Sequence, residues 1–68
     1  MWHIHYHLGG AVGMRSVSTL PAAMRDAFTL IGQGADVGHI EGEGGLIGPN
    51  AAEIKLAYAA SKGKNGRH

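Results

Sequence analysis

Residues 2–8, Trp-His-Ile-His-Tyr-His-Leu, alternate apolar and histidine side chains without interruption. Successive residues of a β-strand face opposite sides of a sheet, so the alternation predicts a half-buried strand. The apolar side chains are expected to face the core: Trp2, Ile4, Tyr6 and Leu8. The imidazoles are expected on the opposite face: His3, His5 and His7. This one strand therefore predicts a sheet with a covered face and a histidine-bearing face.

The residues after this strand predict a hairpin and then a helix. Gly9-Gly10 interrupts the alternation, and residues 12–18 form a second, weaker β-like run. Thr19 is a good helix cap, and Pro21 is tolerated in a first turn because its missing N–H would have had no partner. One apolar stripe follows at helical spacing: Leu20, Ala23, Met24, Ala27, Phe28 and Ile31. Gly32 or Gly34 is expected to end this helix.

A third strand is predicted over residues 35–41. Its apolar residues, Val37 and Ile40, do not share a parity, which predicts a bulge or a short strand. Residues 42–45 are expected to form a flexible glycine loop, after which Leu46 and Ile47 return to the core.

A second helix is predicted to begin at Pro49-Asn50. Asn50 and Glu53 have the spacing of a capping box, and Pro49 and Ile54 occupy the positions of a hydrophobic staple. Three further residues are expected to supply apolar contacts: Leu56, Ala57 and Tyr58. Gly63 is expected to end the helix.

The resulting order is β-β-α-β-α, an α+β domain with a three-stranded sheet and two helices packed on one face. The first strand is expected in the middle of the sheet. Residues 1–63 are predicted to form the single domain, and residues 64–68 a flexible basic tail.

Composition narrows the function classes. A chain of 68 residues is marginally stable alone, and the absence of cysteine excludes disulfides and thiolate metal sites. The additional sources of stability that remain are metal binding by histidine and oligomerisation. No apolar run approaches the roughly 20 residues of a membrane span, and the N-terminus does not resemble a signal peptide. We expect a cytoplasmic protein without membrane association.

The charge is unevenly distributed. Up to Ser61 the chain has three basic and five acidic side chains, and its last residues add three cations: Lys62, Lys64 and Arg67. A nucleic-acid-binding domain usually carries its positive charge on the folded face, so nucleic-acid binding is expected, if anywhere, only weakly and through the tail.

The histidines of residues 2–8 could contribute to a metal site, but not all three could bind the same ion. His3 and His7 lie about 13 Å apart along a strand, too far to share one ion. His39 and Glu41 lie on one face of the third strand, which could run beside the first. The candidate ligands are His5, His7, His39 and Glu41.

No spacing of residues makes a nucleophile–base–orienter set, and the glycines of residues 42–48 lack the spacing and the lysine of a phosphate loop. We therefore expect a non-enzymatic binding module without a cofactor or a small-molecule substrate. Its histidine face, with His3, His5 and His7, is predicted to bind a protein partner or a second copy in a homodimer. The alternatives are divalent metal binding on the same face and weak nucleic-acid binding by the tail. An ordinary solvated sheet face would explain the same histidines without any ligand.

Overall fold

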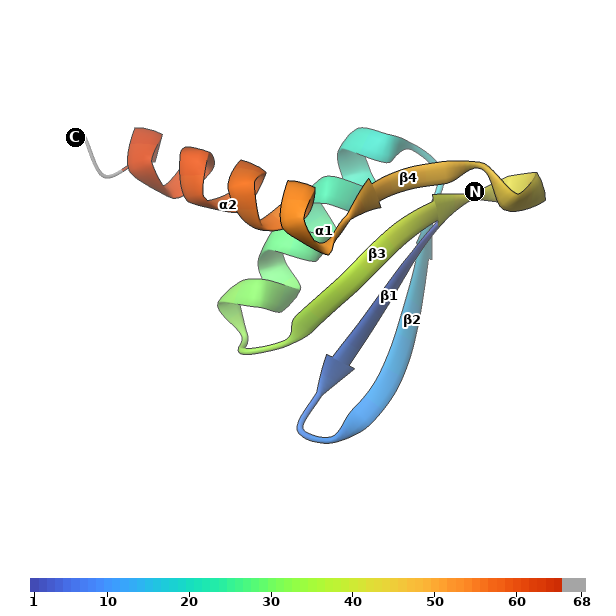
Figure 1. Cartoon of the computed structure of the whole chain (residues 1–68), viewed down its shortest axis with the longest axis horizontal. Helices are drawn as coiled ribbons and strands as arrows, with labels where there is room; N and C mark the ends of the chain where they lie inside the picture. Colours follow the sequence, from blue (N-terminus) through green and yellow to red (C-terminus); the bar gives the residue numbers. More distant parts are fainter. Residues whose placement is uncertain (66–68) are drawn as a thin grey trace.

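The computed structural model describes residues 1–65, and their side chains as far as residue 61 (Figure 1). Its strands are β1 (Trp2–Leu8), β2 (Ala11–Val17), β3 (Asp36–Gly42) and β4 (Ile47–Asn50). Its helices are α1 (Leu20–Gly32), the short 3₁₀ turn η1 (Glu43–Gly45) and α2 (Ala51–Asn65). The α+β class predicted from the sequence is confirmed. No helix within residues 1–65 has the length and apolar character that crossing a membrane requires.

The sheet has four antiparallel strands in the order β2-β1-β3-β4. The predicted number of three was wrong because β4 was overlooked. Its four residues include Gly48 and Pro49 and show no alternation, so they resemble the approach to a helix. β1 lies between β2 and β3, as expected.

The hairpin of β1 and β2 closes through a two-residue turn. Gly9 and Gly10 have φ angles of 60° and 85°, which glycine adopts without steric cost. Two consecutive positive φ angles match the turn type whose twist suits a tight hairpin. The turn pairs Leu8 with Ala11, which sets the register of the whole hairpin.

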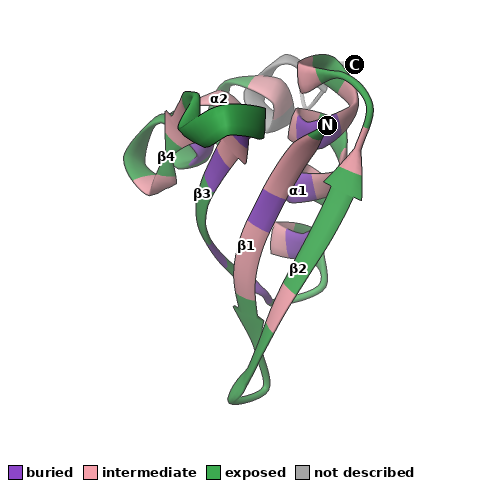
Figure 2. Ribbon diagram, turned by 90° about the vertical axis from the view of Figure 1, so that its right-hand side faces the viewer, coloured by how far each residue is buried: buried purple, intermediate pink, exposed green. Residues whose placement is uncertain are grey.

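The core lies between the sheet and the helices (Figure 2). Its buried members are Ile4, Ala23, Ala27, Leu30, Ala35, Val37, Ile40 and Ile54. Trp2 and Tyr6 are partly buried against this cluster, as the alternation of β1 predicts. Leu8 is 40% exposed because it lies at the tip of the hairpin, beyond the sheet area that α1 covers. Leu46 and Ile47, expected in the core, are 58% and 90% exposed.

Helix α1 begins and ends as its sequence indicates. The Thr19 hydroxyl accepts a hydrogen bond from the amide of Ala22, and Gly34, with φ of 95°, is the left-handed residue after the helix. The amide of Ala35 then donates to the carbonyl of Leu30. Leu30 is fully part of the core although the predicted stripe omitted it.

Helix α2 begins with the predicted capping box. The amide of Glu53 donates to Asn50 Oδ1, and the amide of Asn50 donates to Glu53 Oε1. Ile54 is completely buried, whereas Leu56 is 73% exposed and does not supply the expected apolar contact. The helix continues to Asn65, past Gly63, and its later turns project away from the sheet (Figure 1). The rest of the predicted tail, residues 66–68, lies outside the described residues.

Candidate metal-binding site

A bulge in β3 decides which side chains reach the open face of the sheet. His5 of β1 pairs with His39, but the next residue, Tyr6, pairs with Val37, so Gly38 is the extra residue. The parity of Val37 and Ile40 predicted a bulge or a short strand, and the structure has the bulge, in a strand of seven residues. It lets both of these residues enter the core, at 2% and 1% exposure, while His39 stays directly opposite His5.

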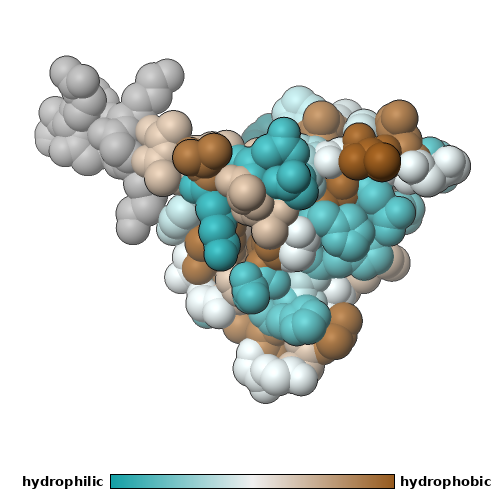
Figure 3. Space-filling model, viewed as in Figure 1, coloured by the Kyte–Doolittle hydropathy of each residue, from teal (hydrophilic) through white to brown (hydrophobic). Residues whose placement is uncertain are grey.

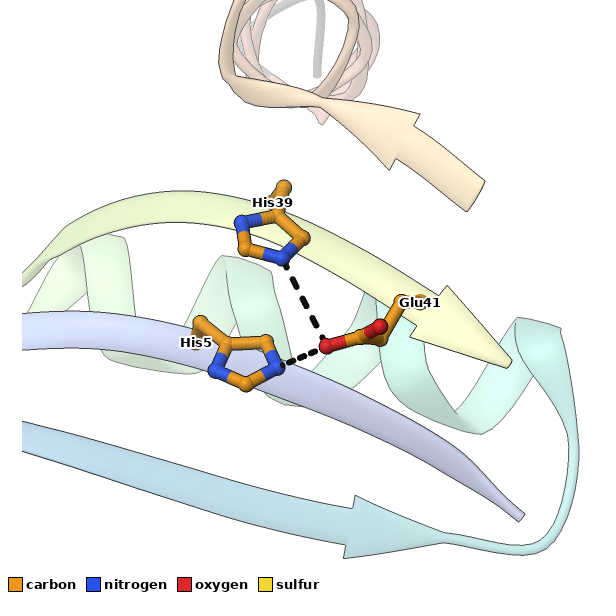
Figure 4. A group of neighbouring side chains, drawn as sticks. All are labelled: His5, His39 and Glu41. Carbon is orange, nitrogen blue, oxygen red and sulfur yellow. Dashed lines mark hydrogen bonds and ion pairs between the residues drawn. The ribbon is translucent and has the colours of Figure 1, made fainter. Parts of the chain in front are cut away.

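Three side chains converge on this open face (Figure 4). Nε2 of His5 lies 2.6 Å from Oε1 of Glu41, and Nε2 of His39 lies 3.7 Å from the same oxygen. The two imidazole rings are stacked, with centroids 4.4 Å apart and planes 13° from parallel. Both rings therefore direct a nitrogen toward one carboxylate oxygen.

The spacing of these atoms is close to that of a metal coordination shell. One potential ligand atom from each of the three residues lies within 4.8 Å of the other two. Zinc with bonds of about 2.0–2.1 Å in a tetrahedron separates its ligand atoms by roughly 3.3 Å. An ion would therefore replace the proton that joins His5 to Glu41, with a small withdrawal of the carboxylate and a tilt of the stacked rings.

The other two histidines of β1 do not join the cluster. His7, a predicted ligand, is exposed and pairs in register with Asp36 and Val12. His3, predicted to contact a partner, has its Nδ1 2.8 Å from the hydroxyl oxygen of Ser16. Sequence reasoning did not foresee this pair. The signal was present, because a two-residue turn at Gly9-Gly10 fixes His3 opposite Ser16.

The cluster is partly exposed on the open face of the sheet. The side chains of His5, Glu41 and His39 are 32%, 40% and 52% exposed, and α1 lies behind the sheet (Figure 4). No cavity forms among the described residues, so the cluster lies on an open surface. Water would have direct access to an ion bound there.

Exposed apolar side chains border the cluster on both sides. Met14, 56% exposed, pairs with His5 from β2, and Ile47, 90% exposed, pairs with Glu41 from β4. Val12, 76% exposed, pairs with His7. Figure 3 shows hydrophilic side chains over the middle of the sheet and strongly hydrophobic ones over the start of β4. The open face thus combines a polar centre with apolar margins.

Comparisons with protein-family models, curated proteins and solved structures find no match to this chain. The basic side chains of the tail lie outside the residues whose side chains are described, so nucleic-acid binding there stays a prediction. The expectations of a non-enzymatic role and of a cytoplasmic location also stay predictions.

Proposed function

We propose that this chain is a small metal-binding protein that holds one divalent transition-metal ion, of which zinc is the best probe, at His5, His39 and Glu41. The observation that supports the proposal is the approach of two imidazole nitrogens to a single carboxylate oxygen. His39 and Glu41 lie on β3, and His5, far from them in the sequence, lies on β1. The bulge at Gly38 is what aligns them.

The donor set suits such an ion. Imidazole and carboxylate ligands are those that zinc accepts in proteins, and two histidines with one carboxylate also suit iron(II). The carboxylate of Glu41 offsets part of the ion's charge. Three protein ligands leave at least one coordination position, which water would fill on a surface as open as this one.

Metal binding would also support the fold. An ion that binds only the folded chain adds roughly 2.7 kcal/mol to its stability when the free ion is at 100 times the dissociation constant. A short chain without cysteine has few other means of gaining that much. The ligands come from the two central strands, β1 and β3, so an ion would join the middle of the sheet.

Calorimetric titration of zinc into chelator-treated protein tests the proposal, with His39→Ala as the test variant. His7→Ala is the matched control, because it removes an imidazole from the same face but outside the cluster. We expect one ion per chain for the wild type and the control, and at least a tenfold weaker affinity for His39→Ala. Equal affinities for the two variants would refute the site.

The second candidate is the interaction role predicted for the histidine face. The exposed apolar margins formed by Val12, Met14 and Ile47 favour it, since a protein laid on this face would cover them. A second copy bound face to face would be weakened by His7→Glu, which adds a carboxylate beside Val12 on the open face of each copy. Light scattering with and without chelator measures this, and an unchanged mass for His7→Glu would contradict the face-to-face arrangement.

A further inference from the structure

The outer edge of β2 is open for pairing. β2 is the last strand on its side of the sheet, and no other helix or strand of residues 1–65 lies beyond it (Figure 2). It has seven residues, contains no proline and carries a single charged side chain, Arg15. An edge strand of this kind presents a row of unpaired backbone groups to other chains.

The opposite edge of the sheet is protected by the usual devices. β4 has only four residues, includes Pro49 and leads directly into α2. Proline removes a backbone donor, and a short strand offers little length for pairing. Of the two edges of the sheet, β2 is therefore the one that is available for pairing with another strand.

The hairpin turn determines which backbone groups of β2 point outward. In a two-residue hairpin the residues that flank the turn, here Leu8 and Ala11, form a hydrogen-bonded pair. Hydrogen-bonded and non-hydrogen-bonded pairs then alternate along an antiparallel ladder. The residues of β2 whose N–H and C=O groups point away from β1 are Val12, Met14 and Ser16.

We infer that a second copy of this chain pairs with β2, antiparallel and edge to edge, about a two-fold axis at Met14. In this register Met14 meets Met14 of the copy, and Val12 meets Ser16, so each outward residue meets an outward residue. The contact is made by the same patch on both copies, as a closed dimer requires.

The charges of β2 are compatible with a second copy as the occupant. Arg15 falls opposite Gly13 of the copy, so no like charges lie directly opposite each other. In its own chain Arg15 is bound to Asp26, with Nε and Oδ2 3.4 Å apart. Met14 is 56% exposed and would gain an apolar neighbour on the open face.

This dimer would be independent of metal. Pairing of β2 with β2 continues the sheet to eight strands and keeps both open faces on the same side. The two β1 strands would then lie three strand spacings apart, about 14 Å. One ion could not join His5 of one copy to His5 of the other, so removal of metal would leave the dimer intact.

Light scattering on the chelator-treated full chain tests the inference, with Met14→Pro against Met14→Ala. Proline at this position removes an outward N–H and no bond to β1, whereas alanine keeps the N–H. We expect a mass of two chains for the wild type and Met14→Ala, and of one chain for Met14→Pro, with circular dichroism showing a folded chain. If proline unfolds the chain, Met14→Lys replaces it, because two ammonium groups would then meet at the axis. It is read against His7→Glu, which changes the open face away from the outer edge of β2 and should leave an edge-paired dimer intact.

A wild type that remains a single chain up to its solubility limit would overturn the inference. So would a dimer that persists in a folded Met14→Pro variant and in Met14→Lys. A dimer that His7→Glu dissociates would place the contact on the open face and would also overturn edge pairing. These outcomes do not depend on zinc, so they are separate from the test of the metal site.

Discussion

The two faces of the central strands are made from alternate residues of the same short segments and differ almost completely in character. On the covered face, Ile4 and Ile40 lie opposite each other at 0% and 1% exposure. On the open face, their sequence neighbours His5 and His39 stack beside Glu41 in contact with solvent. The helices cover the first face, whereas no described residue covers the second.

The difference shows that stability and binding are separable in this small sheet. The apolar face provides the burial that offsets the cost of ordering the chain. The imidazoles on the open face contribute a single short hydrogen bond to Glu41 within their cluster, and a partly exposed pair of this kind adds little to stability. Substitutions on the covered face should therefore lower the unfolding free energy. Substitutions in the cluster on the open face should instead lower the zinc affinity and leave the unfolding free energy almost unchanged.

Gly38, the bulge residue, sets the positions of side chains on both faces of the sheet, so its removal should have the largest effect. Deletion of Gly38 prevents Val37 and Ile40 from being buried together, because a one-residue shift moves side chains to the other face. We expect loss of cooperative folding and of zinc binding together, observed by thermal denaturation and by calorimetry. A deletion variant that folds with wild-type stability would show that the bulge has no such role.

A cavity in the covered face should have the next largest effect. Ile40→Ala removes a buried side chain, which typically costs roughly 2–5 kcal/mol of unfolding free energy. Ile47→Ala is the matched control, since Ile47 is 90% exposed and its loss should cost at most about 0.5 kcal/mol. Chemical denaturation measures both. Similar losses for the two variants would contradict the assignment of the faces.

Neutralising the carboxylate of the open face should hardly change stability. Glu41→Gln removes the charge that faces His5 and His39, and we expect a change in unfolding free energy within about 1 kcal/mol in the absence of metal. Its zinc affinity should nevertheless fall at least tenfold, because an amide oxygen is a poorer ligand for this ion. Glu43→Gln, on the neighbouring 3₁₀ turn, is the control and should retain the affinity.

Acidification should weaken zinc binding more than it weakens the fold. Imidazole must be neutral to coordinate a metal, so protons compete with the ion as the pH falls. We expect zinc affinity to decrease as the pH falls. Calorimetry at several pH values measures this, and a pH-independent affinity would exclude histidine ligands.

The parts of the fold that could be predicted are those with a local physical signature. The alternation of residues 2–8 specified β1 and its two faces, Thr19 specified the start of α1, and Asn50 with Glu53 specified the start of α2. The bulge followed from the parity of Val37 and Ile40. Each of these features depends on contacts between residues close in the sequence or on a strict period.

The features that could not be predicted depend on tertiary contacts. β4 is a strand only because it pairs with β3, since Gly48 and Pro49 have no strand preference of their own. The exposure of Ile47 follows from its position opposite Glu41. The narrowing of the candidate ligands to His5, His39 and Glu41, without His7, required the cross-strand register, which no local pattern supplies.

The most direct test of the metal site is a zinc titration followed by nitrogen NMR of the histidine side chains. We predict that Nε2 of His5 and Nε2 of His39 shift together and saturate at one ion per chain, that chelator reverses the shift, and that His3 and His7 remain unchanged. Weak shifts spread over all the histidines without saturation would contradict the account and make the open face a solvated surface with no metal site.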